Sequence, residues 1–465
     1  MFIGRERELS VLRDHYNSQR FECVGIYGRR RVGKTSLISE FVRELPCGYY
    51  TAIEDDASAN LRLLSQAVYS MQHPDADIET APVYPDFQTA LEAVFAYARD
   101  KRCVFVVDEL PYLAQSYTAF PSILQAVIDR NQGESGLFLI LCGSSLSFMK
   151  EQLLNRNSPL YGRRTAQIEL KPFDFFESLD FFASTPAYDV ANLYGMVGGV
   201  PLYLQQYRDG ISLEDNVQRM FLEPSALLYE EPTNLLKQEV SKAGPYNAVL
   251  SAIADGASRH NQIATKVGMD SRGLDYYLKE LVRLGLVDRE EPITGDGKRR
   301  AVWRIADPLF LFWYKFVRPR QTLIERGLGD RMTNRIMTSL PEHMGPVFER
   351  ICCDWLWRQL AQGSLEFEFT NVGRWWGNDP RTRSQAEIDI VALDEKRTAM
   401  VAECKWRGAQ TSADQLLKLD ARASLANGDA TTLRWLFSQA GFTAGCQELA
   451  SVMEARLITF DQMVR

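Results

Sequence analysis

Three groups of residues in this chain of 465 residues have types and spacings suited to phosphate chemistry. Residues 28–35, GRRRVGKT, fit the pattern GxxxxGK(S/T) at every fixed position. The run CVFVVDE ends in two acids, Asp108 and Glu109, and the segment AECKWR places Glu403 two residues before Lys405. Glycine-rich loops, carboxylates and amines are groups that proteins use to hold phosphates and the metal ions that accompany them.

The first group lies between a strand and a helix, as a phosphate-binding loop requires. Residues 23–27 form a short apolar run typical of a strand, and residues 35–45 have helical spacing. Backbone N–H groups of such a loop wrap phosphates, and the amino end of the helix favours their negative charge. Lys34 would reach the β- and γ-phosphates of ATP, and the Thr35 hydroxyl would bind Mg²⁺. The residues expected to touch the nucleotide here are Gly28, Arg29, Arg30, Arg31, Val32, Gly33, Lys34, Thr35 and Ser36.

A second buried strand that ends in acid is expected beside this loop. Residues 103–107 supply it, because they are apolar at every position. Asp108 would hold Mg²⁺, and Glu109 would polarise the attacking water, which favours ATP hydrolysis over nucleotide binding alone. The alternative interpretation of Asp108 is the N-cap of the following helix.

Polar residues after two later strands are further candidates. The apolar run 137–142 is followed by Ser144 and Ser145, of which Ser144 is a candidate sensor of the γ-phosphate. Either serine could instead cap the next helix. Arg163 and Arg164 precede another strand-like run, and one of them could act as an arginine finger across a subunit boundary. A solvated pair of surface arginines is the alternative.

The segment AECKWR follows a strand-like run, QAEIDIVALD, and an apolar helix that carries one acid, Glu349. Residues two apart on a strand point to the same face, so Glu403 and Lys405 would project together. Asp389 on the neighbouring strand and Glu349 on the helix could join them. Clustered carboxylates bind Mg²⁺ or Mn²⁺, and such a metal activates water for phosphodiester hydrolysis, with Lys405 orienting that water. The alternative is a structural Glu403–Lys405 pair, although buried pairs of this kind seldom stabilise a fold.

The middle of the chain, from about residue 245, reads as three helices separated by turns. A basic segment, residues 294–305, then looks like a hairpin. This order of elements is that of a winged helix, whose third helix would read the major groove of DNA. Winged helices also serve as protein-interaction modules or as lids on an ATPase domain. The residues expected to contact DNA are Arg272, Lys279, Lys298, Arg299 and Arg300.

The first half of the chain resembles the archaeal-type ATPases of the signal-transducing branch of AAA-like P-loop proteins. The resemblance rests on six segments in this order: MFIGRERELSVL, GRRRVGKTS, VVDELPYL, LILCGSS, SPLYGRRT and GGVPLYL. It implies that Arg5 and Glu6 lie beside the nucleotide. It also implies that Pro201 contacts the adenine or couples the nucleotide state to the next domain.

The last quarter is similar to the C-terminal region of those ATPases, a region of unassigned function that itself resembles the PD-(D/E)XK restriction-endonuclease fold. The resemblance rests on the spacing GRWWG…EIDIVA…ECKW. By this resemblance Asp389, Glu403 and Lys405 match the nuclease core, and Glu349 matches its helix acid. Ile388 takes the place of the proline of that motif, a departure that bears on cleavage more than on metal binding.

Composition and length indicate a globular protein of several domains. Hydrophobic residues make up 46% and charged residues 24%, and the net charge of −7 means that DNA contacts must come from local basic patches. The fold class we expect is α/β. The expected domains are a P-loop NTPase parallel sheet at 1–175, a helical lid at 176–240, a winged helix at 241–320 and a restriction-endonuclease-like α/β domain at 321–465.

The chain shows no signal-peptide pattern, no long apolar run and no metal-binding or disulfide spacing of its cysteines, so the predicted location is the cytoplasm, without a membrane partner. Three functions are compatible with these features. The first is an ATP-regulated, DNA-directed nuclease that uses ATP and Mg²⁺. The second is a non-cleaving ATP-dependent switch that forms a nucleotide-dependent homo-oligomer and binds DNA or a protein partner. The third is a protein-partner regulator whose winged helix never touches DNA.

Overall fold

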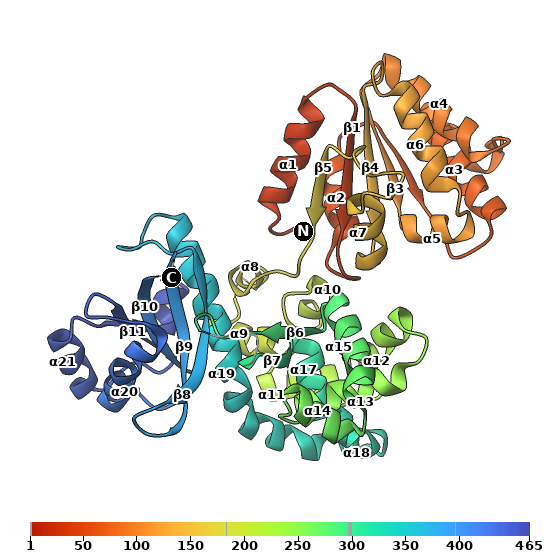
Figure 1. Ribbon diagram of the computed structural model, residues 1–465. Coiled ribbons are helices and arrows are strands. Elements are labelled where there is room, and N and C mark those ends of the chain that lie inside the picture. The colour runs from red at the N-terminus through yellow and green to blue at the C-terminus, as the bar shows by residue number, and fades with distance from the viewer. Residues whose placement is uncertain (1, 183, 296–299, 396) are drawn as a thin grey trace. The chain divides into compact units, whose positions relative to one another are not determined.

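The computed structural model describes residues 2–182, 184–295, 300–395 and 397–465 (Figure 1). The chain divides into two compact units. The first unit comprises Met1–Pro172 and Val200–Leu202, and the second comprises Phe173–Gly199 and Tyr203–Arg465. Among the described residues, every helix is too short or too polar to span a lipid bilayer.

The first unit is built on a five-stranded parallel sheet with the strand order β2–β3–β4–β1–β5. Its three central strands, β1, β3 and β4, are buried at every position because helices cover both faces, which is the usual environment of a parallel sheet. The predicted α/β fold with a parallel sheet is therefore confirmed. The strands are β1 Glu22–Tyr27, β2 Cys47–Thr51, β3 Cys103–Asp108, β4 Leu137–Gly143 and β5 Ala166–Glu169.

Two apolar clusters hold the helices of the first unit to this sheet. Helices α1 and α2 pack on one face, and helices α3, α4, α6 and α7 pack on the other. Amphipathic helices on both faces leave the strand ends as the exposed polar part of the sheet. The helices are α1 Glu6–Asn17, α2 Lys34–Val42, α3 Ala57–Gln72, η1 Ile78–Thr80, α4 Phe87–Asp100, α5 Leu110–Ser116, α6 Phe120–Asn131 and α7 Leu146–Leu154.

The second unit begins with a helical part and ends with a mixed α/β part. Helix α10, Pro201–Leu204, begins in the first unit and ends in the second. The other helices of the helical part are α8 Phe175–Leu179, α9 Ala187–Val197, α11 Leu213–Phe221, α12 Leu227–Glu239, α13 Ala243–Ala254, α14 His260–Val267, α15 Ser271–Arg283, α17 Pro308–Phe312, η2 Trp313–Val317, η3 Arg318–Arg320, α18 Gln321–Glu325 and α19 Asp330–Ala361.

Helices α13, α14 and α15 are followed by an antiparallel hairpin, β6 Val287–Glu290 and β7 Val302–Ile305. Both hairpin strands were predicted within residues 294–305, and this prediction is wrong for the first strand. Helix α15 ends at Arg283, because Gly285 just beyond it adopts the left-handed conformation, with φ of 67°. Strand β6 starts two residues after this glycine. Arg300 consequently lies in the connection between the strands rather than on a basic strand.

The mixed sheet of the second unit has the strand order β12–β11–β10–β9–β8. Strands β8, β9 and β10 form an antiparallel meander, whereas β10, β11 and β12 are parallel. The segment GRWWG lies within β8. The elements are β8 Asn371–Asp379, β9 Ser384–Asp394, β10 Arg397–Lys405, α20 Ala413–Ala423, η4 Ser424–Ala426, β11 Leu433–Ser438, α21 Ala444–Val452, β12 Arg456–Thr459 and α22 Phe460–Met463.

Helix α19 is the longest helix among the described residues and contacts both parts of the second unit. It approaches α9 closely at Gly195, where a Cβ atom would lie 2.3 Å from the sulfur of Met344. Beside this contact, His343 is 3% exposed and its Nε2 lies 2.8 Å from the carbonyl oxygen of Gly195. Burial lowers the pKa of His343 to about 4, so this imidazole is neutral in the folded protein at neutral pH.

The buried imidazole predicts a loss of stability in mild acid. Between the ordinary pKa of about 6.5 and the folded pKa of about 4, the unfolded chain binds a proton that the folded chain does not. Stability therefore falls as the pH drops through this window, by about 3 kcal/mol in total. We expect His343→Gln, which keeps an N–H donor for Gly195, to lose less stability than wild type between pH 7 and 4.

Denaturant unfolding at these two pH values measures the difference, with exposed His73→Gln as the control. An identical pH-dependent loss in His343→Gln, His73→Gln and wild type would contradict the prediction.

Candidate functional site

The phosphate-binding loop lies at the carboxyl end of β1 in the first unit. Gly28 begins the loop against the carbonyl oxygen of Leu170, which a Cβ atom would approach to 2.3 Å. Gly33 ends the loop with φ of 93°, a left-handed conformation that favours glycine, and α2 starts at the next residue. The two glycines thus fix a tight turn that leads into the amino end of a helix, where backbone N–H groups and the helix dipole attract phosphate.

The ammonium of Lys34 points back into this loop. Its Nζ donates to the carbonyl oxygens of Gly28 at 2.9 Å and Arg29 at 3.1 Å, and the residue is only 7% exposed. Burial lowers the pKa of Lys34, while Asp108 and Glu109 act in the opposite direction. An ammonium held in this position can meet the terminal phosphates of a nucleotide bound along the loop.

Asp108 ends β3 beside the first turn of α2. Its Oδ2 accepts a hydrogen bond from the Tyr49 hydroxyl at 2.9 Å and lies 3.5 Å from the Thr35 hydroxyl. Its Oδ1 accepts from the backbone N–H of Glu109 at 2.9 Å. The N-cap position of α5 is held by Glu109 and not by Asp108, so the helix-cap alternative for Asp108 is wrong. A carboxylate next to a threonine hydroxyl is a donor pair suited to Mg²⁺.

Glu109 turns toward the end of β4. Its backbone has φ of 52°, an uncommon conformation for a residue with a side chain. Its Oε2 accepts hydrogen bonds from the Ser144 hydroxyl at 2.9 Å and from the Ser144 N–H at 3.2 Å. Ser145, rather than Ser144, occupies the N-cap of α7. The expected water-polarising acid and the expected phosphate sensor are therefore direct partners.

Arg5 and Pro201 also lie beside the loop. Arg5 is 5% exposed, and its Nη2 donates to the carbonyl oxygens of Lys171 at 2.7 Å and Val32 at 3.2 Å. A Cβ atom on Gly33 would lie 3.9 Å from the Pro201 ring. The structure thus brings both residues, which were expected near the nucleotide, to the wall of the loop.

The other loop residues differ in exposure. Val32 is fully buried in the apolar cluster under α1 and α2, which anchors the loop to the sheet. Arg30 Nη2 donates to the Tyr112 hydroxyl at 2.8 Å. Arg31 has φ of 70°, and Ser36 is exposed on the first turn of α2.

Arg163 and Arg164 lie at the opposite edge of the sheet from the loop. They precede the amino end of β5, where Thr165 N–H donates to the carbonyl oxygen of Cys23 at 2.8 Å. Arg163 pairs with Asp129 of α6 at 2.9 Å, and Arg164 donates to the carbonyl oxygen of Leu153. Neither arginine can serve the nucleotide of its own chain, and a role across a subunit boundary stays a prediction.

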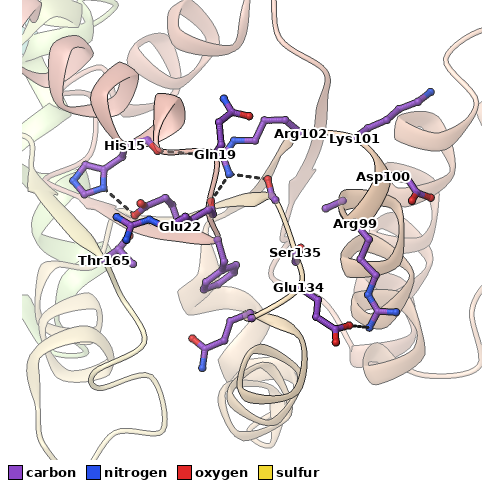
Figure 2. Close-up of a pocket in the computed structure, with 16 residues that line it drawn as sticks. His15, Gln19, Glu22, Arg99, Asp100, Lys101, Arg102, Glu134, Ser135 and Thr165 are labelled. Atoms are coloured by element: carbon purple, nitrogen blue, oxygen red, sulfur yellow. Dashed lines mark hydrogen bonds and ion pairs between the residues drawn. The ribbon is translucent and has the colours of Figure 1, made fainter.

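A cavity of 840 Å³ opens at this amino edge of the sheet (Figure 2). His15 pairs with Glu22 at 2.9 Å on one side of it. Arg102 donates to the carbonyl oxygens of Tyr16 and Gly136, each at 2.7 Å. These contacts join α1, β1 and the start of β4, so the charged groups here hold the sheet edge together and lie away from the phosphate-binding loop.

A second candidate site lies in the mixed sheet of the second unit. Lys405 on β10 contacts two buried carboxylates, with its Nζ 2.6 Å from Glu403 Oε2 and 3.4 Å from Asp389 Oδ2 on β9. Asp389 Oδ2 also accepts a hydrogen bond from the N–H of Cys404 at 2.9 Å. Glu403 Oε1 is buried without a hydrogen-bond partner. The predicted projection of Glu403 and Lys405 to one face is observed, with Asp389 opposite them.

Glu349 lies near these groups but pairs elsewhere. Its Oε2 is 2.9 Å from Nε of Arg374, and this guanidinium also reaches Glu387 at 3.3 Å and Glu290 at 3.8 Å. Within the described ranges, no three His, Cys, Asp or Glu side chains are arranged to hold a metal ion. The expected carboxylate set is thus present as one buried pair, with Glu349 set apart by Arg374.

The surroundings shift the ionisation of this site. Burial and then Asp389 raise the pKa of Glu403 to about 7, against the opposing effect of Lys405. Burial and then Asp389 and Glu387 raise the pKa of Glu349 to about 9. Burial alone would lower the pKa of Lys405, but Asp389 and Glu403 raise it above its ordinary value. Carboxyl groups whose pKa is raised by burial beside a specific charged partner are frequent at functional sites.

The residues predicted to contact DNA are only partly gathered by the structure. Arg272 and Lys279 lie on the exposed face of α15. Arg300 is exposed, and its carbonyl oxygen accepts a hydrogen bond from the Trp376 indole at 2.9 Å. Lys298 and Arg299 lie outside the described residues.

Three residues that contact the groups of these two sites were not predicted from the sequence. Tyr49 binds Asp108 from β2, Arg374 pairs with Glu349, and Arg422 of α20 lies 3.7 Å from Glu403 Oε1. Arg374 stands inside the quoted segment GRWWG, so a basic residue close to the expected acids was a usable signal. Tyr49 and Arg422 carry no such signal, because only the tertiary fold brings them to their partners.

The comparisons with known proteins agree with this architecture. The family described as an ATPase domain predominantly from Archaea matches residues 2–207, and a family of archaeal and bacterial proteins of unknown function matches residues 313–416. Protein MJECL04 of Methanocaldococcus jannaschii is 30% identical over 409 residues, which are 88% of each chain. ATP-binding protein MJ0423 of the same organism is 45% identical over 42 residues, 9% of this chain and 71% of that one.

A solved structure shows a similar fold. The Walker-type ATPase PABY2304 of Pyrococcus abyssi aligns with a TM-score of 0.53 and 19% identity, over 68% of this chain and 96% of that chain. The match to the ATPase-domain family over residues 2–207 shows that the protein is an ATPase. Because a relative of 30% identity also spans nearly the whole length, this chain belongs to the family of ATPases whose nucleotide-binding domain is found predominantly in Archaea.

Proposed function

We propose that this ATPase couples the nucleotide state of its first unit to DNA binding and to metal-dependent phosphodiester cleavage in its second unit. The observation that carries the cleavage part is the position of Lys405. Its ammonium joins Asp389 and Glu403, which are buried on adjacent strands of a mixed sheet. The alternative of a purely structural pair explains these groups less well, because burying two carboxylates costs several kcal/mol before any pairing, and the side chain of Lys405 beside them stays 24% exposed.

For ATP hydrolysis, residues at the phosphate-binding loop and the adjoining strand ends would divide the work among them. Lys34 would contact the terminal phosphates, and the hydroxyl of Thr35 with the carboxylate of Asp108 would hold Mg²⁺, which neutralises phosphate charge. Glu109 would orient the attacking water and accept its proton. Ser144, bonded to Glu109, would report whether a γ-phosphate is present by keeping or losing that hydrogen bond.

In a nucleotide-dependent homo-oligomer, the arginines at the far edge of the sheet would act on a neighbouring chain. Arg163 and Arg164 lie too far along the strands to reach their own loop. An arginine finger in trans requires that the arginines of one copy lie against the nucleotide of the next copy.

For phosphodiester cleavage, the donor set suits a hard divalent cation. Glu403 Oε1 is a buried oxygen without a hydrogen-bond partner, and Asp389 lies across from it. These two carboxylates would hold Mg²⁺ or Mn²⁺, which would activate a water molecule and offset charge on the scissile phosphate. Lys405 would orient that water, and Arg374 would keep Glu349 in position beside the site.

In this proposal the helical part of the second unit would supply the DNA-binding surface. The order of α13, α14, α15 and the β6–β7 hairpin supports a winged helix, whose third helix would enter the major groove. Arg272 and Lys279 on the exposed face of α15 would contact phosphates.

A second candidate function is an ATP-dependent switch that does not cleave DNA and uses the second unit to bind DNA or a protein partner. The observation that favours it is the pairing of Glu349 with Arg374, which leaves two carboxylates at the acid site among the described residues.

The phosphate-binding loop predicts the behaviour of Lys34→Ala. Removing the ammonium takes away a charge-stabilising contact to the terminal phosphates, so we expect ATP hydrolysis to fall by about 10² or more. Release of inorganic phosphate measures the rate, and calorimetry with ATP and Mg²⁺ measures binding. Lys101→Ala, which changes an exposed lysine at the far edge of the sheet, is the control. Equal rates for both variants would show that the loop is not the hydrolytic site.

Glu109→Gln separates hydrolysis from binding. The amide keeps the size of the side chain but cannot accept a proton from water, so hydrolysis should fall by about 10² to 10⁴, while ATP affinity changes little. Single-turnover hydrolysis and equilibrium binding are the two measurements. If Glu109→Gln hydrolyses ATP at the wild-type rate, Glu109 does not position the attacking water.

Plasmid nicking with Mg²⁺ or Mn²⁺ tests the acid site. We expect Lys405→Ala and Asp389→Asn to abolish nicking, because each removes a group that would hold the water or the metal. Asp389→Asn keeps the oxygen that accepts from Cys404 N–H, so it is the milder change for the fold. Lys418→Ala, an exposed lysine of α20, is the control. Nicking that survives both site variants would come from another site, and a wild type that never nicks would favour the non-cleaving switch.

A further inference from the structure

A cavity of 480 Å³ lies inside the second unit, between the helical part and the edge of the mixed sheet. Its walls carry three arginines and one tryptophan. Arg304 comes from β7, Arg374 and Trp376 come from β8, and Arg422 comes from α20, with Glu387 of β9 as the acid in the wall. A cavity of this size admits a single nucleotide, whereas the width of a DNA duplex does not fit.

The wall of this cavity is held by backbone and indole hydrogen bonds. The N–H of Ile293 donates to the carbonyl oxygen of Arg374 at 2.9 Å, and the Trp376 indole donates to the carbonyl oxygen of Arg300 at 2.9 Å. Both bonds tie the connection between β6 and β7 to strand β8. The cavity is therefore a built feature of the second unit, formed by two elements that are bonded to each other.

The arginines keep donors for a ligand after their existing contacts are counted. Arg304 Nε pairs with Glu290 at 2.9 Å, and Arg422 Nη1 donates to the carbonyl oxygen of Glu387 at 3.2 Å. A guanidinium has five N–H donors in a fixed fork, so these contacts occupy a part of each group. Both side chains are about one-third exposed, at 39% and 32%.

The lining of the cavity holds more guanidinium groups than carboxylates. Three guanidinium groups line it against the single carboxylate of Glu387. Glu290 offsets part of this charge through Arg304 and Arg374. Glu349 lies 2.9 Å from Arg374 and offsets the charge of that guanidinium, so Arg304 and Arg422 are the arginines that would meet a ligand.

Arg422 connects this cavity to the acid site. Its Nη1 lies 3.7 Å from Glu403 Oε1, which is a buried oxygen without a hydrogen-bond partner. A phosphate held on Arg422 would therefore lie next to the carboxylate that belongs to the proposed cleavage site. Arginine is suited to this position because its planar fork matches the oxygens of a phosphate.

We infer that this cavity binds one nucleotide of single-stranded DNA, with its phosphate on Arg304 and Arg422 and its base against Trp376. An aromatic ring beside a basic groove is the general means of holding a single strand without reading its sequence. The inference deepens the proposed function by naming a single strand, or a splayed strand end, as the substrate class. Binding itself does not require cleavage, so the two can fail separately.

Fluorescence anisotropy with a labelled single-stranded DNA oligonucleotide, in EDTA and at two salt concentrations, tests the inference on the full chain. We expect Arg422→Gln and Arg304→Gln each to weaken binding about tenfold and to make the salt dependence shallower by about one unit. Arg434→Gln is the matched control, because Arg434 is paired with Asp420 at 2.9 Å in the same mixed α/β part but does not line the cavity. Its binding should equal that of wild type.

The tryptophan offers an independent pair of variants. Trp376→Leu removes the aromatic face and should weaken binding about tenfold, whereas Trp376→Phe keeps a ring and should bind nearly as wild type does. Thermal unfolding of each variant identifies any that fail to fold. The more exposed Arg304 then carries the test if Arg422→Gln does not fold.

The outcomes are distinct. Loss of single-strand binding in the cavity variants, with duplex binding unchanged by the same substitutions, supports the inference. Wild-type binding by Arg304→Gln and Arg422→Gln, or equal dependence of duplex binding on these arginines, overturns it. If the cavity variants lose binding and wild type still never nicks DNA, the cavity stands and the cleavage proposal fails. If nicking depends on Lys405 but single-strand binding does not depend on the cavity arginines, the cleavage proposal is supported and the cavity inference fails.

Discussion

Both candidate sites depend on a lysine ammonium that the fold holds among oxygen atoms, with Lys34 7% exposed and the side chain of Lys405 24% exposed. An isolated buried ammonium costs several kcal/mol, so the fold must surround it with oxygen atoms. Lys34 meets this constraint with two carbonyl oxygens of its own loop, and Lys405 meets it with carboxylates from two strands. In each site the oxygens that stabilise the lysine also define where a phosphate or a metal ion can approach. The oxygen atoms that offset the cost of desolvating each lysine are therefore the same atoms that shape its binding site.

The two sites differ in how local their parts are, which explains how well each could be predicted. The phosphate-binding loop is continuous in sequence, and its partner acids follow a strand that is apolar at every position, so residues such as Lys34 and Asp108 could be identified by pattern. The acid site draws on elements far apart in the chain. Its strand pair was predictable from alternation, but the diversion of Glu349 to Arg374 depends on helix packing that no local pattern encodes.

The hairpin of the second unit shows the same limit at the level of secondary structure. Both strands were predicted within residues 294–305 because that segment is basic. The position of the first strand is instead set by the left-handed Gly285, which ends α15. The tryptophans of GRWWG lie on β8, where Trp375 is buried against the sheet, and only the tertiary fold shows this. Residue composition located the hairpin approximately. The residues at which its strands begin and end depend on backbone conformation and tertiary packing.

The bond between Ile293 and strand β8 has a consequence for the integrity of the second unit. Strand β8 is the outer strand of its sheet, and such strands present unpaired backbone groups that template aggregation. The connection between β6 and β7 covers part of this edge by donating to the carbonyl oxygen of Arg374. A fragment that starts after the hairpin would expose that part of the edge and would be prone to self-association, so the helical part also acts as a guard for the sheet.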